Sequence, residues 1–260
     1  MSLISIIENA FFANGRYWGS LNSSLYSCGS IRAMKTGIES ADLNMAWNEK
    51  PLMPGDNKAI QNIKKDFQQA GLPFWWWVFP NSQSPATIDM LKAEGFSFVE
   101  SIPSMLADLT GLSGEEARDS AVSITRVSNK EELNLWEEVS FSGFNFPYKT
   151  KEQYHRFFNT FNLRADAPQK FFLACLNGIP TATSLLFMDG NAGSIYFITT
   201  LAEQRKKGIG LELTTATMRF AKMAGARFAA LQSSPDGLRV YQQAGFKEYC
   251  RVDVYSLNVA

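Results

Sequence analysis

Apolar and polar residues follow one another in short blocks along the second half of the chain, and the blocks have the lengths of strands and helices. Ser128 and Glu131 form a capping box for a helix that ends near residue 140. The turn Asn177-Gly178 joins two apolar runs as a hairpin. Strands are predicted at 123–127, 170–176, 181–188, 195–200, 228–231 and 249–257. A further helix is predicted at 211–224, and Thr150 and Gln153 indicate the start of another. This order predicts a mixed α/β domain.

The first half carries a weaker version of the same pattern, with strands predicted at 31–38, 43–47 and 75–79 and a helix at 58–70. Gln83-Ser84-Pro85 and Gly95-Phe96 recur, with small changes, 150 residues later as Ser233-Ser234-Pro235 and Gly245-Phe246. We therefore interpret the chain as a duplication. The polar segment 110–120 predicts a boundary between an N-terminal domain, 1–117, and a C-terminal domain, 118–260.

Composition restricts the function classes. Hydrophobic residues make up 45% of the chain and charged residues 19%, as in a folded protein, and 25 basic residues balance 25 acidic ones. A chain without net charge has no bulk field for nucleic acid or an anionic membrane. The longest run of bulky apolar residues, 74–79, is far shorter than a membrane span, and the N-terminus lacks a basic leader region, so we expect a cytoplasmic protein.

Metal and histidine chemistry are not indicated. Cys28, Cys175 and Cys250 are odd in number and widely separated, which favours neither a disulfide framework nor a zinc site. The single histidine, His155, lies in a polar helical stretch and is expected to be a surface residue. We therefore expect no bound metal.

The segment Arg205-Lys206-Lys207-Gly208-Ile209-Gly210 follows a predicted strand and opens a predicted helix. First-turn amides lack intrahelical partners, the helix dipole attracts anions, and two glycines let a ligand approach the backbone, so the loop is suited to a pyrophosphate. The alternative is an ordinary strand-to-helix turn whose basic side chains are solvent-exposed and bind no ligand. A phosphate loop with G-x-x-x-x-G-K-[ST] is absent, and Leu213 stands where a dinucleotide fingerprint has its third glycine. The corresponding loop of the first half, 51–56, has none of these features, so a single cofactor site is expected.

The second half of the chain resembles the GCN5-related N-acetyltransferase (GNAT) family. The resemblance depends on the order of a strand, the R-x-x-G-x-G corner, a helix, a strand and the segment Tyr241-Gln242-Gln243-Ala244-Gly245-Phe246. The resemblance covers residues 122–257 well and the first half weakly. Ala202 and Lys206 replace a proline and a glycine that are frequent in the family. The resemblance implies two tandem GNAT-like domains with a degenerate N-terminal copy, each a mixed, mostly antiparallel sheet flanked by helices.

The resemblance also implies the roles of particular residues. A pantetheine arm is expected along the strand that holds Ile198, Thr199 and Thr200, and the coenzyme A pyrophosphate on the amides of the 205–210 corner, whereas Ser234 and Tyr241 face the sulfur. The implied reaction is transfer of an acetyl group from acetyl-CoA to a primary amine of a small molecule or peptide, in a ternary complex. The acceptor and the oligomeric state stay open.

Tyr241 is our candidate general acid, because a phenol with a pKa near ~10 can protonate a departing thiolate whose thiol has a pKa near ~8.5. The alternative is a packed helix tyrosine. No residue is assigned as the base that deprotonates the amine: Glu203, Glu248 and Asp253 are expected to be solvated, and Tyr196 shares a strand face with Ile198. A Phe-rich loop, 141–147, is a candidate acceptor lid or core packing.

Two alternatives to the acetyltransferase remain at this point. A non-catalytic acyl-CoA-binding or interaction module would need no base, and an acyltransferase could use another acyl donor. The three tryptophans at 75–77 are expected to belong to a buried central strand rather than to an acceptor wall.

Overall fold

The computed structural model describes residues 2–113 and 121–257. Their contacts divide the chain into two compact units, Met1–Ser104 with Tyr249–Ala260 (unit 1) and Met105–Glu248 (unit 2). The predicted boundary at 117/118 lies outside the described residues. The division differs from the predicted one at the end of the chain: the last strand, assigned by sequence to the C-terminal domain, belongs to unit 1, where Val254 pairs with Trp77.

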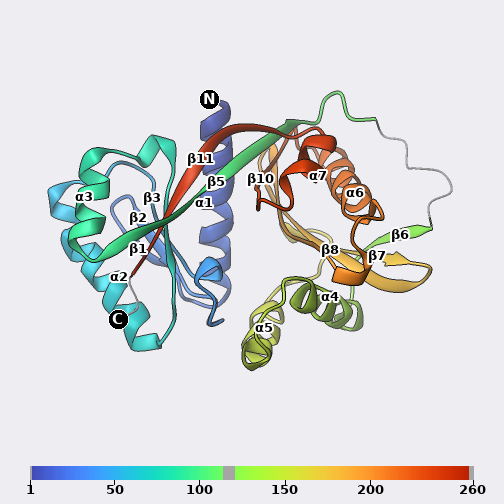
Figure 1. Ribbon diagram of the computed structural model, residues 1–260, viewed down its shortest axis with the longest axis horizontal. Helices are drawn as coiled ribbons and strands as arrows, with labels where there is room; N and C mark the ends of the chain where they lie inside the picture. Colours follow the sequence, from blue (N-terminus) through green and yellow to red (C-terminus); the bar gives the residue numbers. More distant parts are fainter. Residues whose placement is uncertain (1, 114–120, 258–260) are drawn as a thin grey trace. The chain divides into compact units, whose positions relative to one another are not determined.

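Unit 1 is a sheet between helices. Its strand order is β1-β2-β3-β4-β11-β5, with β3 and β4 parallel and β4 and β11 antiparallel. One helix, α1, covers one face, and α2 and α3 cover the other (Figure 1). The elements are α1 (Leu3–Leu21), β1 (Tyr26–Cys28), β2 (Ile31–Met34), η1 (Ala41–Leu43), β3 (Met45–Asn48), η2 (Pro54–Asp56), α2 (Asn57–Ala70), β4 (Trp75–Val78), η3 (Pro80–Ser82), α3 (Pro85–Ala93), β5 (Phe96–Asp108) and β11 (Lys247–Leu257).

Alternation along β4 fills both sides of that sheet. The Trp76 ring packs at 5.7 Å from the Phe96 ring, on the α2 and α3 face, and Trp77 packs at 4.9 Å from Phe11 of α1. Both tryptophans are buried, which confirms the buried-strand interpretation. Helix α1 was not predicted, although Ser2 caps it by accepting from the Ser5 amide.

Unit 2 contains the second copy of the pattern. Its strand order is β5-β10-β9-β8-β7-β6, antiparallel from β6 to β9 and parallel between β9 and β10. Helices α4 and α5 lie on one face of this sheet and α6 and α7 on the other (Figure 1). The elements are β6 (Val122–Arg126), α4 (Lys130–Gly143), η4 (Tyr148–Thr150), α5 (Lys151–Phe158), β7 (Gln169–Leu176), β8 (Ile179–Asp189), β9 (Ala192–Thr200), η5 (Ala202–Gln204), α6 (Ile209–Met223), β10 (Phe228–Gln232) and α7 (Leu238–Gln243).

The hairpin turn predicted in unit 2 is confirmed, and the predicted start of α4 is displaced by one residue. Asn177 and Gly178 have φ of 51° and 79° and close the β7–β8 hairpin as predicted. The cap of α4 differs from the prediction by one residue: Asn129 is the N-cap, accepting from the Glu132 amide, and the Glu132 carboxylate accepts from the Ser128 amide. The carboxylate that reaches back is thus Glu132 and not Glu131, because the helix begins one residue later than predicted.

The two halves of the chain repeat one arrangement: a strand, a helix, a parallel strand, a short helix and a final strand. It runs β3-α2-β4-α3-β5 in the first half and β9-α6-β10-α7-β11 in the second. Gly95 and Gly245, the matched glycines, both have left-handed φ, 89° and 100°, directly after the short helix. The observed fold confirms the prediction of a mixed α/β protein with helices flanking the sheet.

Candidate active site

Strands β9 and β10 pair only at their beginnings. Their register runs from Ala192 opposite Phe228 to Ser194 opposite Ala230. Beyond Ser194, β9 continues to Thr200 with no further pairing to β10 among the described residues, although it keeps β8 on its other side, where Thr200 lies opposite Ala182. The edge of β9 that carries the predicted pantetheine residues, 198–200, is therefore open on the β10 side.

A bulge interrupts β9 within this open stretch. Opposite β8 the register jumps from Leu185–Tyr196 to Thr183–Thr199, which leaves an extra residue in β9. Phe197 has φ of 50°, a conformation that a bulky residue adopts only where its surroundings impose it. The Thr183 hydroxyl donates to the Phe197 carbonyl at 3.0 Å, which helps to hold the bulge in place.

The loop from Arg205 into α6 contains a row of backbone amides without acceptors in the described part of the protein. Among the described residues, the amides of 206–210 donate to no protein acceptor, whereas the next amide, of Leu211, donates to the Gly208 carbonyl at 3.0 Å. Lys206 and Gly208 both have left-handed φ, 63° and 82°, so the chain folds back on itself at this corner. The amide of Arg205 is not part of the row, because it donates to Ala202.

The two glycines of the corner differ in whether the protein itself requires them. Gly208 has positive φ and is the N-cap of α6, which favours glycine for conformational reasons. Gly210 has ordinary helical geometry, and a Cβ atom there would meet only the Thr200 hydroxyl, at 3.5 Å, an ordinary contact. No part of the described protein requires a glycine at position 210.

The Arg205 side chain does not extend over the amide row. Its Nε donates to the Thr200 carbonyl at 3.0 Å and its terminal nitrogen to the Gly143 carbonyl at 3.1 Å. Gly143 ends α4 and lies so near β9 that an added Cβ would be 2.6 Å from the Thr199 hydroxyl. One guanidinium thus joins the end of α4, the end of β9 and the corner, a role that the sequence did not indicate. The other cations differ: Lys207 donates to Gln204, and Lys206 is exposed.

Tyr241 on α7 is 7% exposed and belongs to the apolar cluster that contains Ile209 and Leu231. Burial raises its pKa to about 12. Its hydroxyl has no hydrogen-bond partner within the described part of the chain. The backbone of Gly237 passes so close over the ring that a Cβ there would lie 2.6 Å from it.

Ser234 is exposed at the turn before α7. Its hydroxyl accepts from the Gly237 amide at 3.2 Å, which fixes the turn over Tyr241. In unit 1 the matched residue, Ser84, caps α3 in a similar manner by accepting from the Thr87 amide at 3.0 Å. The repeated Ser-Pro pair therefore has a structural role in both units.

Residues 131–246, just under half of the chain, match the Acetyltransferase (GNAT) family. All of these residues lie in unit 2. Unit 2 also contains the strand opening, which is the unpaired edge of β9 at 195–200, the amide row at 206–210 and Tyr241. We refer to this matched segment as the GNAT domain. No curated protein matches the sequence significantly.

Solved structures of the GNAT fold extend over most of the chain. A GCN5-related N-acetyltransferase from Kribbella flavida is similar with a TM-score of 0.70 and 19% identity, over 96% of each chain. A functionally unknown conserved protein from Staphylococcus epidermidis follows at 0.64 and 14%, over 91% of this chain and 94% of its own. A tandem GNAT protein from the clavulanic acid biosynthesis pathway has 0.59 and 14%, over 87% and 77%. These likenesses confirm the predicted fold class, and the family match at 131–246 confirms the predicted family resemblance.

The residues considered as a base lie in different parts of the structure. Glu203 and Glu248 are exposed. Asp253 belongs to unit 1, where it accepts from Gln83 at 3.0 Å. Tyr196 is partly exposed, but its hydroxyl is buried and burial raises its pKa. The base stays unassigned among these residues.

The Phe-rich segment 141–147 packs rather than projecting as a lid. Phe141 and Phe146 lie 5.4 and 5.3 Å from the Tyr154 ring, and Phe144 lies 5.8 Å from Phe197 at the β9 bulge. This segment therefore forms an aromatic wall between α4, α5 and β9.

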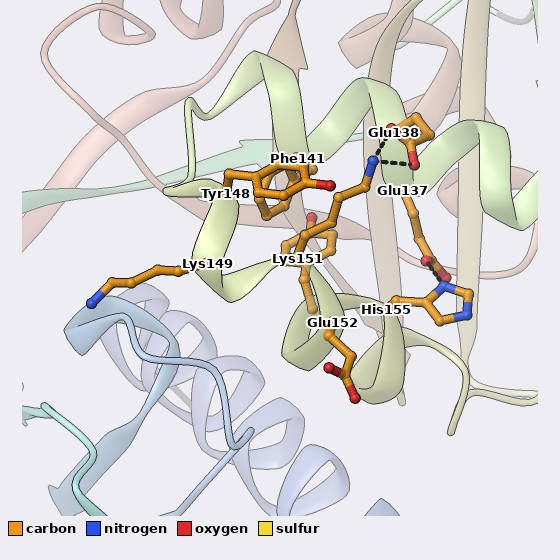
Figure 2. A pocket seen from close by; sticks show the side chains of 9 residues that line it. Glu137, Glu138, Phe141, Tyr148, Lys149, Lys151, Glu152 and His155 are labelled. Atoms are coloured by element: carbon orange, nitrogen blue, oxygen red, sulfur yellow. Dashed lines mark hydrogen bonds and ion pairs between the residues drawn. The ribbon is translucent and has the colours of Figure 1, made fainter.

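Sequence reasoning missed a buried acid in the GNAT domain. The Glu137 side chain on α4 is only 6% exposed, and its carboxylate lies 2.6 Å from Nδ1 of His155 (Figure 2). Burial raises the pKa of Glu137. His155 is a surface residue as predicted, 58% exposed. The only sequence signal for Glu137 is its place next to the buried Trp136 on a helix, which does not identify His155 as its partner.

Neither a metal-binding group nor a membrane-spanning helix is found among the described residues. Within 2–113 and 121–257, no three His, Cys, Asp or Glu residues are grouped so that they could hold a metal ion. Over the same residues, no helix combines the length and apolar character needed to cross a bilayer.

Proposed function

We propose that the GNAT domain binds acetyl-CoA and transfers its acetyl group to a primary amine of a small molecule or peptide, by direct attack of the amine in a ternary complex. The observation that carries the proposal is the row of unpartnered amides at 206–210, beside a strand edge left open by its neighbour. A ligand with a diphosphate at one end and an amide-bearing arm at the other suits both features.

The amide row supports the diphosphate end. Five consecutive N–H groups at the start of a 15-residue helix provide donors and a positive dipole end for an anion. Hydrogen bonds to charged groups contribute roughly 1.5–3 kcal/mol each, so three such bonds would supply about 4.5–9 kcal/mol, a large part of the roughly 8 kcal/mol that micromolar binding requires. Lys206 and Lys207 add positive charge near the row. A phosphate on the amides also explains the glycine at position 210, which nothing in the protein requires.

The open edge of β9 supports the arm. Backbone groups of Ile198, Thr199 and Thr200 would hold the pantetheine amides as a neighbouring strand would. The Thr200 carbonyl already accepts from Arg205, so the arm would use the remaining groups of the edge. The bulge at Phe197 redirects the strand where the thioester carbonyl is expected, and amides freed by a bulge are suitable donors to the oxyanion that develops there.

Tyr241 is our proposed acid, with Ser234 at the turn beside it. A phenol with a pKa of about 12 stays protonated at every working pH, as a proton donor must. Transfer to a thiolate whose thiol has the ordinary pKa of ~8.5 is uphill by about 5 kcal/mol. Tyr241 can therefore act only if the departing sulfur is desolvated in the same apolar surroundings, because burial raises the pKa of a thiol as well.

The same burial favours a second candidate function, a non-catalytic acyl-CoA-binding module. In that case Tyr241 would only pack against Phe246, whose ring lies 6.2 Å away. Release of free thiol from acetyl-CoA, measured across a panel of amines, separates the two functions. Amine-dependent release identifies the transferase, and binding without release identifies the module.

Calorimetric titration tests the binding proposal directly. Acetyl-CoA should bind at one site per chain, and acetylated pantetheine, which lacks the diphosphate, should bind at least a hundredfold more weakly, the loss expected for two charged hydrogen bonds. Absence of heat with acetyl-CoA, or equal affinity for the two compounds, would reject the proposed site.

A further inference from the structure

A cavity of about 520 Å³ opens between α4, η4 and the first turns of α5, within unit 2 (Figure 2). Its volume lies in the range of pockets that bind small molecules. Carboxylates, ammonium groups and aromatic rings meet in it, contributed by Glu137, Glu138, Phe141, Tyr148, Lys149, Lys151, Glu152, Tyr154 and His155.

The chain's own Lys151 shows which chemical group this cavity holds. Its Nζ lies 2.8 Å from each carboxylate oxygen of Glu138 and 6.0 Å from the centre of the Tyr148 ring (Figure 2). The hydrogen bond to Glu138 raises the pKa of Lys151. An alkylammonium group thus already lies between a carboxylate and an aromatic face at this cavity.

Glu137 is a second carboxylate in the same cavity, and its only ion-pair partner among the described residues is a histidine. Its side chain is almost fully buried, and the partners of its oxygens are His155 at 2.6 Å and Asn159 at 3.4 Å. A buried carboxylate favours a cationic partner, and an imidazole that is largely exposed provides a full charge only when it is protonated. A ligand ammonium group in the cavity would supply that charge.

The cavity does not open onto the β9 bulge. Tyr154, which lines it, has its ring centre 6.4 Å from that of Phe197, so a layer of aromatic rings separates the cavity from the strand opening. An ammonium group bound in the cavity is therefore not the amine that attacks a thioester beside β9.

We propose that this cavity binds a small linear diamine at a site separate from the reacting amine, with one ammonium group at Glu137 and the other at Glu138 and the Tyr148 ring, where the Lys151 ammonium group lies. This binding site is independent of the proposed acetyltransferase function. The volume of the cavity favours a small molecule over a folded or extended protein partner.

The binding test uses the full chain without acetyl-CoA and a linear diamine, 1,5-diaminopentane, in a calorimetric titration. Glu137→Gln and Tyr148→Ala should each weaken diamine binding, the first by about tenfold or more, since it removes a charge-assisted hydrogen bond. Glu131→Gln is the matched control: it makes the same charge change on an exposed position of the same helix and should leave the affinity unaltered.

Lys151→Ala provides a test in the opposite direction. It removes the internal ammonium group that competes for Glu138 and Tyr148, so the diamine should bind roughly two- to fivefold more tightly. A merely structural role of Lys151 would give weaker binding or no change. Circular dichroism verifies folding of each variant, and Tyr148, 82% exposed, can be truncated without loss of core packing.

Several outcomes would overturn the inference. They are no diamine binding by the intact chain, equal affinity in the Glu137→Gln and Tyr148→Ala variants, or tight binding of a lysine-containing peptide that the diamine does not match. Each can occur while acetyl-CoA still binds, so failure of this inference is distinguishable from failure of the proposed function.

Discussion

Replacement of Gly210 by alanine separates what the protein needs from what a ligand needs. Gly210 is in the first turn of α6 with ordinary helical geometry, and a Cβ atom would contact only the Thr200 hydroxyl, at 3.5 Å. Alanine is preferred over glycine in helices by up to about 1 kcal/mol, so Gly210→Ala should leave the free energy of unfolding unchanged or raise it by a few tenths to ~1 kcal/mol. The added methyl group would stand beside the amides proposed to hold the diphosphate.

A phosphate displaced from one charged hydrogen bond loses roughly 1.5–3 kcal/mol, which is about a 10- to 150-fold rise in the Kd of acetyl-CoA. Urea denaturation measures the first quantity and calorimetric titration the second. Gly55→Ala is the matched control, because Gly55 is exposed in unit 1, has no positive φ and meets nothing within 4 Å. If Gly210→Ala binds acetyl-CoA as tightly as the Gly55→Ala control, the diphosphate does not lie on these amides.

Three further substitutions test other parts of the site. Arg205→Gln should reduce stability by about 1–2 kcal/mol in urea denaturation and also weaken acetyl-CoA binding, because a charged donor to the Thr200 and Gly143 carbonyls is lost; unaltered values for both would contradict the joining role. Gly143→Ala should destabilise by about 1–3 kcal/mol despite the better helix propensity of alanine, since its Cβ would lie 2.6 Å from Thr199, and a stabilised variant would show that α4 can shift. Tyr241→Phe should preserve stability, as the hydroxyl has no partner among the described residues, and should slow amine-dependent turnover by roughly 10- to 100-fold at constant acetyl-CoA affinity. With a pKa of about 12, Tyr241 should add no falling limb to the pH–rate profile below about pH 11, and undiminished turnover of Tyr241→Phe would remove the acid from the mechanism.

Local signals in the sequence were enough for most elements of the GNAT domain. The Asn177-Gly178 turn, the helix after Gly208 and the repeated glycines at 95 and 245 all have the left-handed or capped geometry that their residue types favour. Such features depend on the conformational preferences of one to four residues, so they can be predicted without knowing any distant partner. The misplacement of the α4 cap by one residue has the same origin, because two adjacent glutamates, 131 and 132, compete for one role.

Tertiary structure decided everything that depends on partners far apart in the sequence. Pairing of β11 with β4, the early end of pairing between β9 and β10, and the bonds of Arg205 to Gly143 join segments with no local signal for one another. The Glu137–His155 contact is of the same kind, since a helical pattern can predict a buried position but not the residue that faces it. The order of elements and the glycine corner could therefore be predicted from the sequence, because they follow from short-range backbone preferences. The open strand edge, the unpartnered amides and the cavity of Figure 2 arose only from packing, because each is defined by what does or does not lie beside it.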